Sequence, residues 1–216
     1  MIRALVPAKA LGEAKGRLAS TLSVDERREL ALAMLTDVLT ALRSVAEIDG
    51  VSVISPDSHV LGLATKLGAT PIAESANVTG IGRALERAIS SMSPPPDAVI
   101  IVLGDLPEVT PEDVRTLIGS LPERGVAASP SADGGTSAMA ARPPHVIEFH
   151  YGPKSFARHR EQAAQTGVEF REVPLKSLAR DMDTAEDLRD LLSRPTTTST
   201  QRLLTRLGVA ERLHAA

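Results

Sequence analysis

Five apolar residues, Ala98 to Val102, run without a polar interruption, and four of them are β-branched. Such a run predicts a strand buried on both faces, as in the parallel sheets of α/β proteins. The next five residues are Leu103-Gly104-Asp105-Leu106-Pro107. They place Asp105 just beyond the carboxyl end of that strand, the edge at which open α/β sheets bind ligands. The chain therefore predicts a covered sheet with an acid at its binding edge.

The first 120 residues alternate between strand and helix patterns. Strands are predicted at 2–6, 51–55, 70–73 and 98–102. The capping box Ser23-Val24-Asp25-Glu26 predicts a helix to about Val45, and further helices are predicted at about 57–68, at 84–92 and after Thr110-Pro111. This alternation indicates parallel strands joined by right-handed crossovers, a Rossmann-like three-layer α/β sandwich.

From Gly125 onward the pattern changes. Short strands at 126–129, 137–141 and 169–173 surround a predicted helix at 153–166, which indicates a small antiparallel edge or cap. A last core helix follows Asp183-Thr184. We expect one domain over residues 1–194, then a polar linker and a C-terminal amphipathic helix over 195–216, covering an edge or a dimer seam.

Composition excludes several function classes. The net charge of -3 provides no positive field for a nucleic acid, and 2% aromatic residues provide no stacking platform. The absence of cysteine excludes disulfides, thiolate metal sites and cysteine nucleophiles. The apolar stretch at 2–10 is interrupted by Arg3 and Lys9 and is too short for a signal peptide or a membrane span. We expect a cytoplasmic protein that binds neither nucleic acid nor membrane.

Acidic residues suggest a metal site. Asp105 follows the buried strand, and Asp181 and Asp183 flank Met182 far along the chain. Carboxylates suit a hard cation such as Mg²⁺, which uses few protein ligands together with substrate phosphates. Two alternatives stay open for the later pair. Asp181 to Thr184 also resembles the nucleophile motif of haloacid-dehalogenase phosphatases, although that motif closes an early strand, and an ordinary helix cap at Thr184 would need no ligand.

Two segments could bind phosphate. Lys9, Lys15 and Arg17 lie in the first strand-to-helix loop, which lacks the Gly-Lys-Ser/Thr of a Walker loop. Farther along, Asp133-Gly134-Gly135-Thr136 offers close backbone amides and a hydroxyl, although a plain hairpin turn would have the same composition. A helix start at Ser155 could add amides and a dipole, and His150 and His159 flank it.

Five motifs together resemble one family, the phosphoenolpyruvate or 2-phospho-L-lactate guanylyltransferases of deazaflavin coenzyme biosynthesis. The resemblance covers positions 2 to about 192 in order. Its motifs are Pro7-x-Lys9-x-Leu11 with Lys15-x-Arg17-Leu18, Gly104-Asp105-Leu106-Pro107, Asp133-Gly134-Gly135-Thr136, Tyr151-Gly152-x-x-Ser155-Phe156-x-x-His159, and Asp181-x-Asp183-Thr184.

The resemblance implies a glycosyltransferase-A-like nucleotidyltransferase fold. It implies Mg²⁺ and transfer of GMP from GTP to a phosphorylated three-carbon acid, phosphoenolpyruvate or 2-phospho-L-lactate, with release of pyrophosphate. The family usually has Gly-Leu-Asn before its third helix, whereas this chain has Gly80-Ile81-Gly82.

Site roles carried over from the resemblance fall into four groups. Catalysis would involve Lys9, Lys15, Arg17 and Asp105; the nucleotide would contact Pro7, Lys9, Lys15, Arg17, Gly80, Gly104 and Asp105; the acceptor would contact Gly135, Thr136, Gly152 and Ser155; and the metal would be held by Asp105, Asp181 and Asp183. The expected partners are GTP and a small phosphorylated carboxylic acid. A homodimer and hand-off of product to a downstream transferase are left open.

Three alternative functions share these residues in part. A 3-phosphoglycerate guanylyltransferase would differ only in its acceptor. A sugar-phosphate or molybdopterin nucleotidyltransferase would share the sheet and acids, although so few aromatic residues disfavour a stacked pterin. A non-catalytic, nucleotide-binding regulatory subunit would keep the basic loop and tolerate the loss of Asp105.

Overall fold

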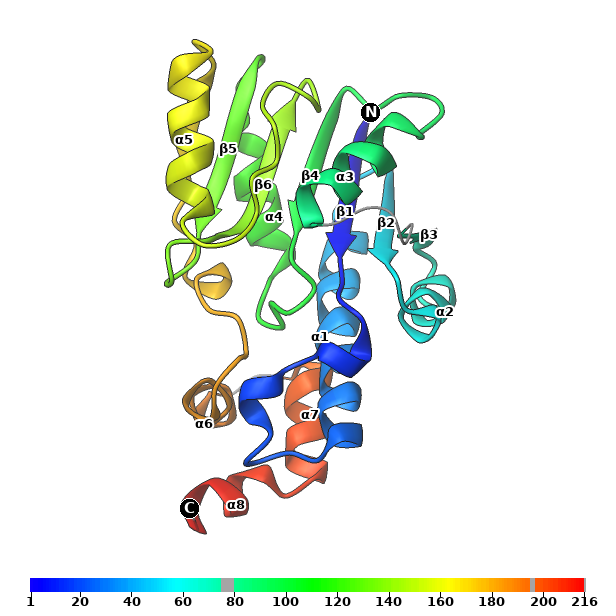
Figure 1. Cartoon of the computed structure of the whole chain (residues 1–216), viewed down its shortest axis with the longest axis vertical. Coiled ribbons are helices and arrows are strands. Elements are labelled where there is room, and N and C mark those ends of the chain that lie inside the picture. Colours follow the sequence, from blue (N-terminus) through cyan, green and yellow to red (C-terminus); the bar gives the residue numbers. More distant parts are fainter. Residues whose placement is uncertain (75–79, 195–196, 216) are drawn as a thin grey trace.

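A computed structural model describes residues 1–74, 80–194 and 197–215. Within them lies one seven-stranded sheet with the order β3-β2-β1-β4-β6-β5-β7 (Figure 1). Its strands are β1 (Ile2–Pro7), β2 (Gly50–Ser55), β3 (Thr70–Ala73), β4 (Ala98–Val102), β5 (Gly125–Pro130), β6 (Thr136–Arg142) and β7 (Glu169–Glu172). The central strands β1 and β4 begin side by side, with Ile2 opposite Ala98.

Strand direction divides the sheet into two parts. Strands β1 to β4 pair in parallel, as expected. Strand β6 runs antiparallel to both β4 and β5, while β5 and β7 pair in parallel. The expected antiparallel part is therefore a single reversed strand within the sheet. Because Val102 pairs with Ala138, the start of β6 lies beside the carboxyl end of β4 and thus near Asp105.

Helices cover both faces and make the sheet the middle layer of three. On one face pack α1 (Val24–Arg43), α2 (Ser58–Lys66) and α4 (Pro111–Gly119), and on the other α3 (Ile81–Ser90) and α5 (Ser155–Gln165). Strand β4 shows why the apolar run has no polar break, since Ile100 and Val102 face one layer while Val99 and Ile101 face the other. The expected three-layer sandwich is confirmed.

Local capping signals locate several helix starts. Ser23 and Glu26 form the expected reciprocal capping box at α1, and Thr110 with Asp113 forms another at α4. Helix α2 begins after Asp57, whose side chain accepts from the amide of His59. None of the described helices is long and apolar enough to cross a membrane.

A third apolar core, here called the C-terminal cluster, lies beside the amino-terminal half of α1. It joins Leu30 and Met34 of α1 to the helices α6 (Ala185–Ser193), α7 (Ser199–Arg206) and α8 (Val209–Ala215), which Figure 1 shows beyond the edge of the sheet. Asp37 of α1 accepts hydrogen bonds from the amides of Ser199 (2.6 Å) and Thr200 (2.9 Å) at the start of α7.

The segment after residue 194 therefore packs on the first helix. Residues 195, 196 and 216 of the expected linker and tail lie outside the described residues. The single tail helix expected from the leucine spacing is wrong in one respect, because the chain forms two helices with a break at Gly208. Gly208 has φ +62, a left-handed conformation that suits a helix end.

Candidate active site

A cavity of about 980 Å³ lies at the edge where β1 and β4 end and β6 begins. It is lined by nearly all the residues singled out from the sequence. These are Pro7, Lys9, Lys15, Arg17, Gly104, Asp105, Gly135, Thr136, Gly152, Ser155, Asp181 and Asp183. Gly80 does not line it, although its neighbour Ile81 does. Segments far apart in the sequence thus share one cavity, while the individual roles stay predictions.

The loop after β1 holds Lys15 between two carboxylates. Two short 3₁₀ turns, η1 (Leu11–Glu13) and η2 (Gly16–Leu18), flank Lys15, whose φ of 54° is left-handed. Its Nζ donates to Asp105 Oδ2 at 2.9 Å and to Asp183 Oδ1 at 2.7 Å, and its side chain is only 6% exposed. A non-glycine residue in this conformation is uncommon and costs energy that the ion pairs offset.

Charge coupling shifts the pKa values of this group. Burial alone would lower the pKa of Lys15, but Asp105 and Asp183 outweigh it and hold that pKa above its usual value. Burial would likewise raise the pKa of Asp183, but Lys15, Arg17 and Lys9 bring it below the usual range. For Asp181, burial and repulsion from Asp183 and Asp105 raise the pKa. Lys15 and Asp183 are therefore charged at neutral pH.

Three aspartates of the cavity are placed so that they could bind a metal ion. One carboxylate oxygen from each of Asp105, Asp181 and Asp183 lies within 4.8 Å of the others. Hard divalent cations prefer oxygen donors, and Mg²⁺ binds them at about 2.0–2.1 Å, so a small adjustment would close the set around an ion. The ammonium of Lys15 neutralises only part of this negative charge, so the donor set suits a divalent cation.

Met182 explains how two aspartates reach the cavity from one segment. Asp181 and Asp183 line the cavity, whereas Met182 between them is 2% exposed and packs in the C-terminal cluster. Leu18, at the end of the basic loop, is buried in the same cluster. Thr184 then caps α6 through Asp187. The cluster therefore anchors the acidic pair and the basic loop together.

The cavity wall on the β6 side is built from the turn before β6 and the start of α5. The Asp133 carboxylate accepts from the Gly135 amide at 2.9 Å and closes the turn. Hydrogen bonds from Ser131 and Gly135 hold the pKa of Asp133 below its usual range. Ser155 Oγ donates to Thr136 Oγ1 at 3.1 Å, joining the helix start to the strand start. The hydroxyls of Thr136 and Ser155 thus enter the cavity from the side of β6, whereas the basic loop follows β1.

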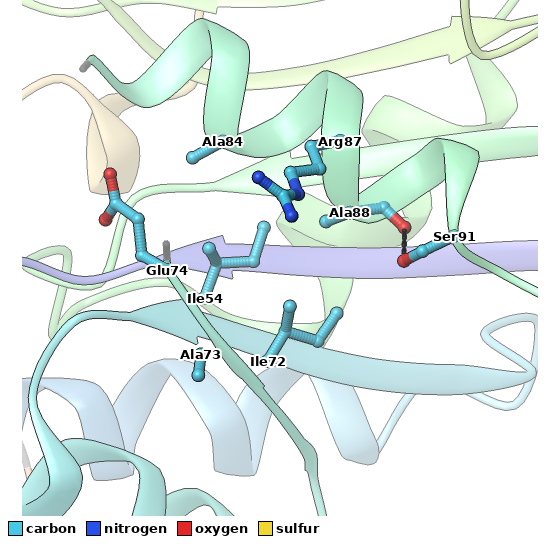
Figure 2. A pocket seen from close by; sticks show the side chains of 8 residues that line it. All are labelled: Ile54, Ile72, Ala73, Glu74, Ala84, Arg87, Ala88 and Ser91. Carbon is cyan, nitrogen blue, oxygen red and sulfur yellow. Dashed lines mark hydrogen bonds between the residues drawn. The ribbon is translucent and has the colours of Figure 1, made fainter. Parts of the chain in front are cut away.

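A smaller hollow of about 190 Å³ adjoins the main cavity (Figure 2). It lies between β2, β3 and α3, and shares Ile54, Glu74 and Ala84 with the larger one. Figure 2 shows the Glu74 carboxylate and the Arg87 guanidinium on either side of apolar side chains. This end of the cavity is more apolar than the charged end at Asp105.

Several lining residues received no role from the sequence. Lys154 precedes α5 in a left-handed conformation with φ 57°, and Asp133, Tyr151 and Glu74 also line the cavity. Lys154 and Asp133 lie within motifs already singled out, so the sequence could have predicted that they line the site. Glu74 follows a short edge strand, where one acid among many gives no local signal.

Comparison with known proteins identifies relatives along almost the whole chain. The family described as "Guanylyl transferase CofC like" matches residues 2–215. The phosphoenolpyruvate guanylyltransferase of Sphaerobacter thermophilus is 42% identical over 189 residues, covering 87% of this chain and 91% of that protein. The 2-phospho-L-lactate guanylyltransferase of Methanothermobacter thermautotrophicus is 35% identical over 189 residues, covering 88% and 83%.

Solved structures confirm the fold expected from the sequence. A crystal structure of a putative nucleotide-diphospho-sugar transferase from Desulfovibrio desulfuricans superimposes with a TM-score of 0.80. The alignment covers 99% of this chain and 97% of that one at 19% identity. At that identity the likeness concerns the fold alone, a nucleotidyltransferase sandwich of the glycosyltransferase-A-like type.

Proposed function

Because the chain belongs to the family of CofC-like guanylyl transferases, we propose that it transfers GMP from GTP to phosphoenolpyruvate or 2-phospho-L-lactate and releases pyrophosphate. The observation that supports this most is that one cavity is lined both by the charged side chains around Asp105, here called the charged wall, and by the hydroxyls of Thr136 and Ser155, the hydroxyl wall. The charged wall suits a triphosphate, and the hydroxyl wall suits a small acid. The same proposal places the reaction in deazaflavin coenzyme biosynthesis.

The nucleotide would occupy the side of β1 and β2. Lys9, Lys15 and Arg17 supply positive charge where the triphosphate would lie. The apolar surface at Ile54, Val60 and Ala84 suits the base. Gly104 lines the cavity next to Asp105, and a Cβ added there would lie 3.4 Å from the carbonyl oxygen of Pro7.

Asp105, Asp181 and Asp183 are the residues that we propose to hold Mg²⁺. When bound, such an ion neutralises the charge of the triphosphate and polarises the α-phosphorus. Lys15 already contacts Asp105 and Asp183, so its ammonium would remain beside the reacting phosphates. Arg17, 78% exposed, has room to move onto a phosphate at the mouth of the cavity.

The acceptor would bind at Gly135, Thr136, Gly152 and Ser155, on the opposite wall. An oxygen of its phosphate forms the bond to the α-phosphorus of GTP, while the bond from that phosphorus to the bridging oxygen breaks. Pyrophosphate leaves with that oxygen. The attacking phosphate has a second pKa of about 6 and is largely ionised at neutral pH, so no protein base is needed. Positioning and charge neutralisation supply the rate.

An acceptor panel tests the proposal. Purified protein is given GTP, Mg²⁺ and either phosphoenolpyruvate, 2-phospho-L-lactate, 3-phosphoglycerate or a sugar 1-phosphate, and pyrophosphate release is followed. We expect one of the two proposed acids to react fastest. The control is Asp105→Asn, which keeps size and shape but removes a charge, and we expect it to lower turnover by orders of magnitude while the protein stays folded.

Each contrary outcome identifies an alternative. Faster reaction with 3-phosphoglycerate or a sugar phosphate would replace the acceptor and keep the chemistry. GTP binding without release of pyrophosphate from GTP, whichever acceptor is added, would indicate a regulatory subunit. Near wild-type turnover of Asp105→Asn at saturating Mg²⁺ would contradict the proposal that Asp105 holds the metal ion.

A further inference from the structure

His159 is a fully buried polar side chain behind the acceptor wall. It lies on α5, is 0% exposed and does not line the cavity itself. Its Nδ1 lies 3.0 Å from Thr136 Oγ1, and its Nε2 accepts from the His150 amide at 2.8 Å. Tyr151 packs edge-on against the ring, with centroids 5.6 Å apart. The ring is thus held on both nitrogens.

These two contacts fix the tautomer. A backbone amide can only donate, so Nε2 must offer its lone pair to His150. A neutral ring then carries its proton on Nδ1 and donates it to Thr136 Oγ1. Burial, together with the charges of His150 and Arg158, lowers the pKa of His159 to about 4, which keeps the ring neutral.

The arrangement leaves one hydroxyl proton at Thr136 and Ser155 available for a ligand. Thr136 Oγ1 accepts from His159 Nδ1 and lies 3.1 Å from Ser155 Oγ, a contact in which either hydroxyl can donate to the other. Because the Nδ1 proton of His159 cannot accept, the two hydroxyls together keep one proton that neither needs for the other, and both residues line the cavity into which it can point. The pair therefore offers a hydroxyl proton to the cavity, which suits an oxyanion as the ligand.

We propose that His159 is a positioning residue that makes the paired hydroxyls of Thr136 and Ser155 a dedicated donor to an oxyanion of the acceptor. His159 then governs acceptor affinity from behind the wall, without touching the substrate. The inference rests on the proposed function for the identity of the acceptor. The hydrogen-bond arrangement itself is independent of that function.

Imidazole nitrogen NMR tests the arrangement directly. Nitrogen-15-labelled protein is compared with His159→Gln, which identifies the signals of His159. We expect a neutral ring protonated on Nδ1, the less common tautomer, with no titration between about pH 5.5 and 8. A ring protonated on Nε2, or one that titrates in that range, overturns the inference.

Two substitutions test the effect on the acceptor. His159→Asn keeps a donor near the position of Nδ1, whereas His159→Gln keeps an acceptor near the position of Nε2. We expect His159→Gln to raise the acceptor KM roughly tenfold to hundredfold, the loss typical of one hydrogen bond to a charged group. His159→Asn should restore most of that loss, and the KM for GTP should change less than about twofold in both.

His145→Gln, at an exposed position, is the matched control and should leave both KM values unchanged. Equal KM changes for acceptor and GTP in His159→Gln, or no rescue by Asn, would show a merely structural role and overturn the inference. Wild-type protein that uses none of the phosphorylated acids would instead overturn the proposed function and the acceptor role of Thr136 with it.

Discussion

Lys15 forms ion pairs with two acidic side chains of the cavity. Its ammonium bonds both Asp105 and Asp183 and is almost fully buried, whereas Arg17 lies 4.0 Å from Asp183 and is 78% exposed. Breaking a buried charge pair costs more than breaking an exposed one, because solvent screens the latter. The two cations of one loop should therefore contribute unequally.

We expect Lys15→Met to lower kcat/KM for GTP by about tenfold to hundredfold, the loss of one hydrogen bond of about 1.5–3 kcal/mol from its ammonium to a charged phosphate. Arg17→Met, the matched substitution in the same loop, should cause a smaller loss that shrinks further at high salt. Steady-state kinetics at fixed acceptor, at low and at high salt, measures both. A larger loss for Arg17→Met would assign the buried lysine a role in folding alone.

Asp57 connects the basic loop to α2. Its carboxylate accepts from the Leu11 amide and the His59 amide, each at 2.9 Å. Burial raises the pKa of Asp57, but these hydrogen bonds and one from Val60 outweigh it and bring the pKa below its usual value. A depressed pKa in the folded state means that the ionised carboxylate stabilises the fold above the unfolded-state pKa of about 3.9.

Asp57→Ala should cost about 0.5–2 kcal/mol at pH 7, the usual loss for a helix cap. The difference from wild type should diminish as the pH falls through the folded-state pKa, because the wild-type carboxylate is then protonated. Urea unfolding of both proteins from neutral pH down to about pH 3 measures this. A difference that stays constant over that range would mean that the ionised form is not what stabilises the loop.

At the scale of elements, Gly82 shows why the chain departs from the usual Gly-Leu-Asn pattern. A Cβ added at Gly82 would lie 1.9 Å from the carbonyl oxygen of Phe149. Helix α3 therefore packs directly on the backbone before α5, and no side chain fits between them. The glycine at this position therefore permits a close approach of two elements that an asparagine side chain would prevent.

We expect Gly82→Ala to destabilise the protein by about 1–3 kcal/mol, the range for overpacking. Gly62→Ala is the matched control, because Gly62 lies within α2 and a Cβ there meets nothing within 4 Å. That change should stabilise the protein by up to about 1 kcal/mol through helix propensity. Thermal unfolding of the two variants measures both effects. Similar melting temperatures for Gly82→Ala and Gly62→Ala would contradict the close packing at Gly82.

Local signals predicted the elements well, and non-local contacts account for what they missed. The capping boxes at Ser23 and Thr110 depend on residues three apart, so short patterns located both helix starts. The direction of β6 depends on its neighbours in the sheet, and residue periodicity does not encode direction. Likewise, the contact of His159 with Thr136 joins residues 23 apart, and nothing local to either predicts it.

For the whole molecule, the C-terminal cluster couples stability to the site. Leu18 of the basic loop and Met182 of the acidic segment pack with Leu204 of α7. The sequence indicated an amphipathic tail, but not that it supports the residues around the cavity. Loosening this core should therefore disturb the positions of Lys15 and Asp183.

Leu204→Ala and Leu117→Ala each empty a fully buried position, in the C-terminal cluster and in the core under α4 respectively. Both should cost about 2–5 kcal/mol. Only Leu204→Ala should raise the KM for GTP, measured well below either melting temperature. Equal KM values in the two variants would show that the cluster is not coupled to the site.

The reversed strand β6 has a consequence for how such a protein can diversify. It brings a turn and a helix start from residues 130–159 to the edge already used by β1 and β4. Thr136 and Ser155 thus come from a different stretch of sequence than Lys9, Lys15 and Arg17. If the proposed roles hold, substitutions within residues 130–159 would change which acid is accepted while the basic loop still binds the nucleotide, so we expect few mutations to be enough for a new acceptor.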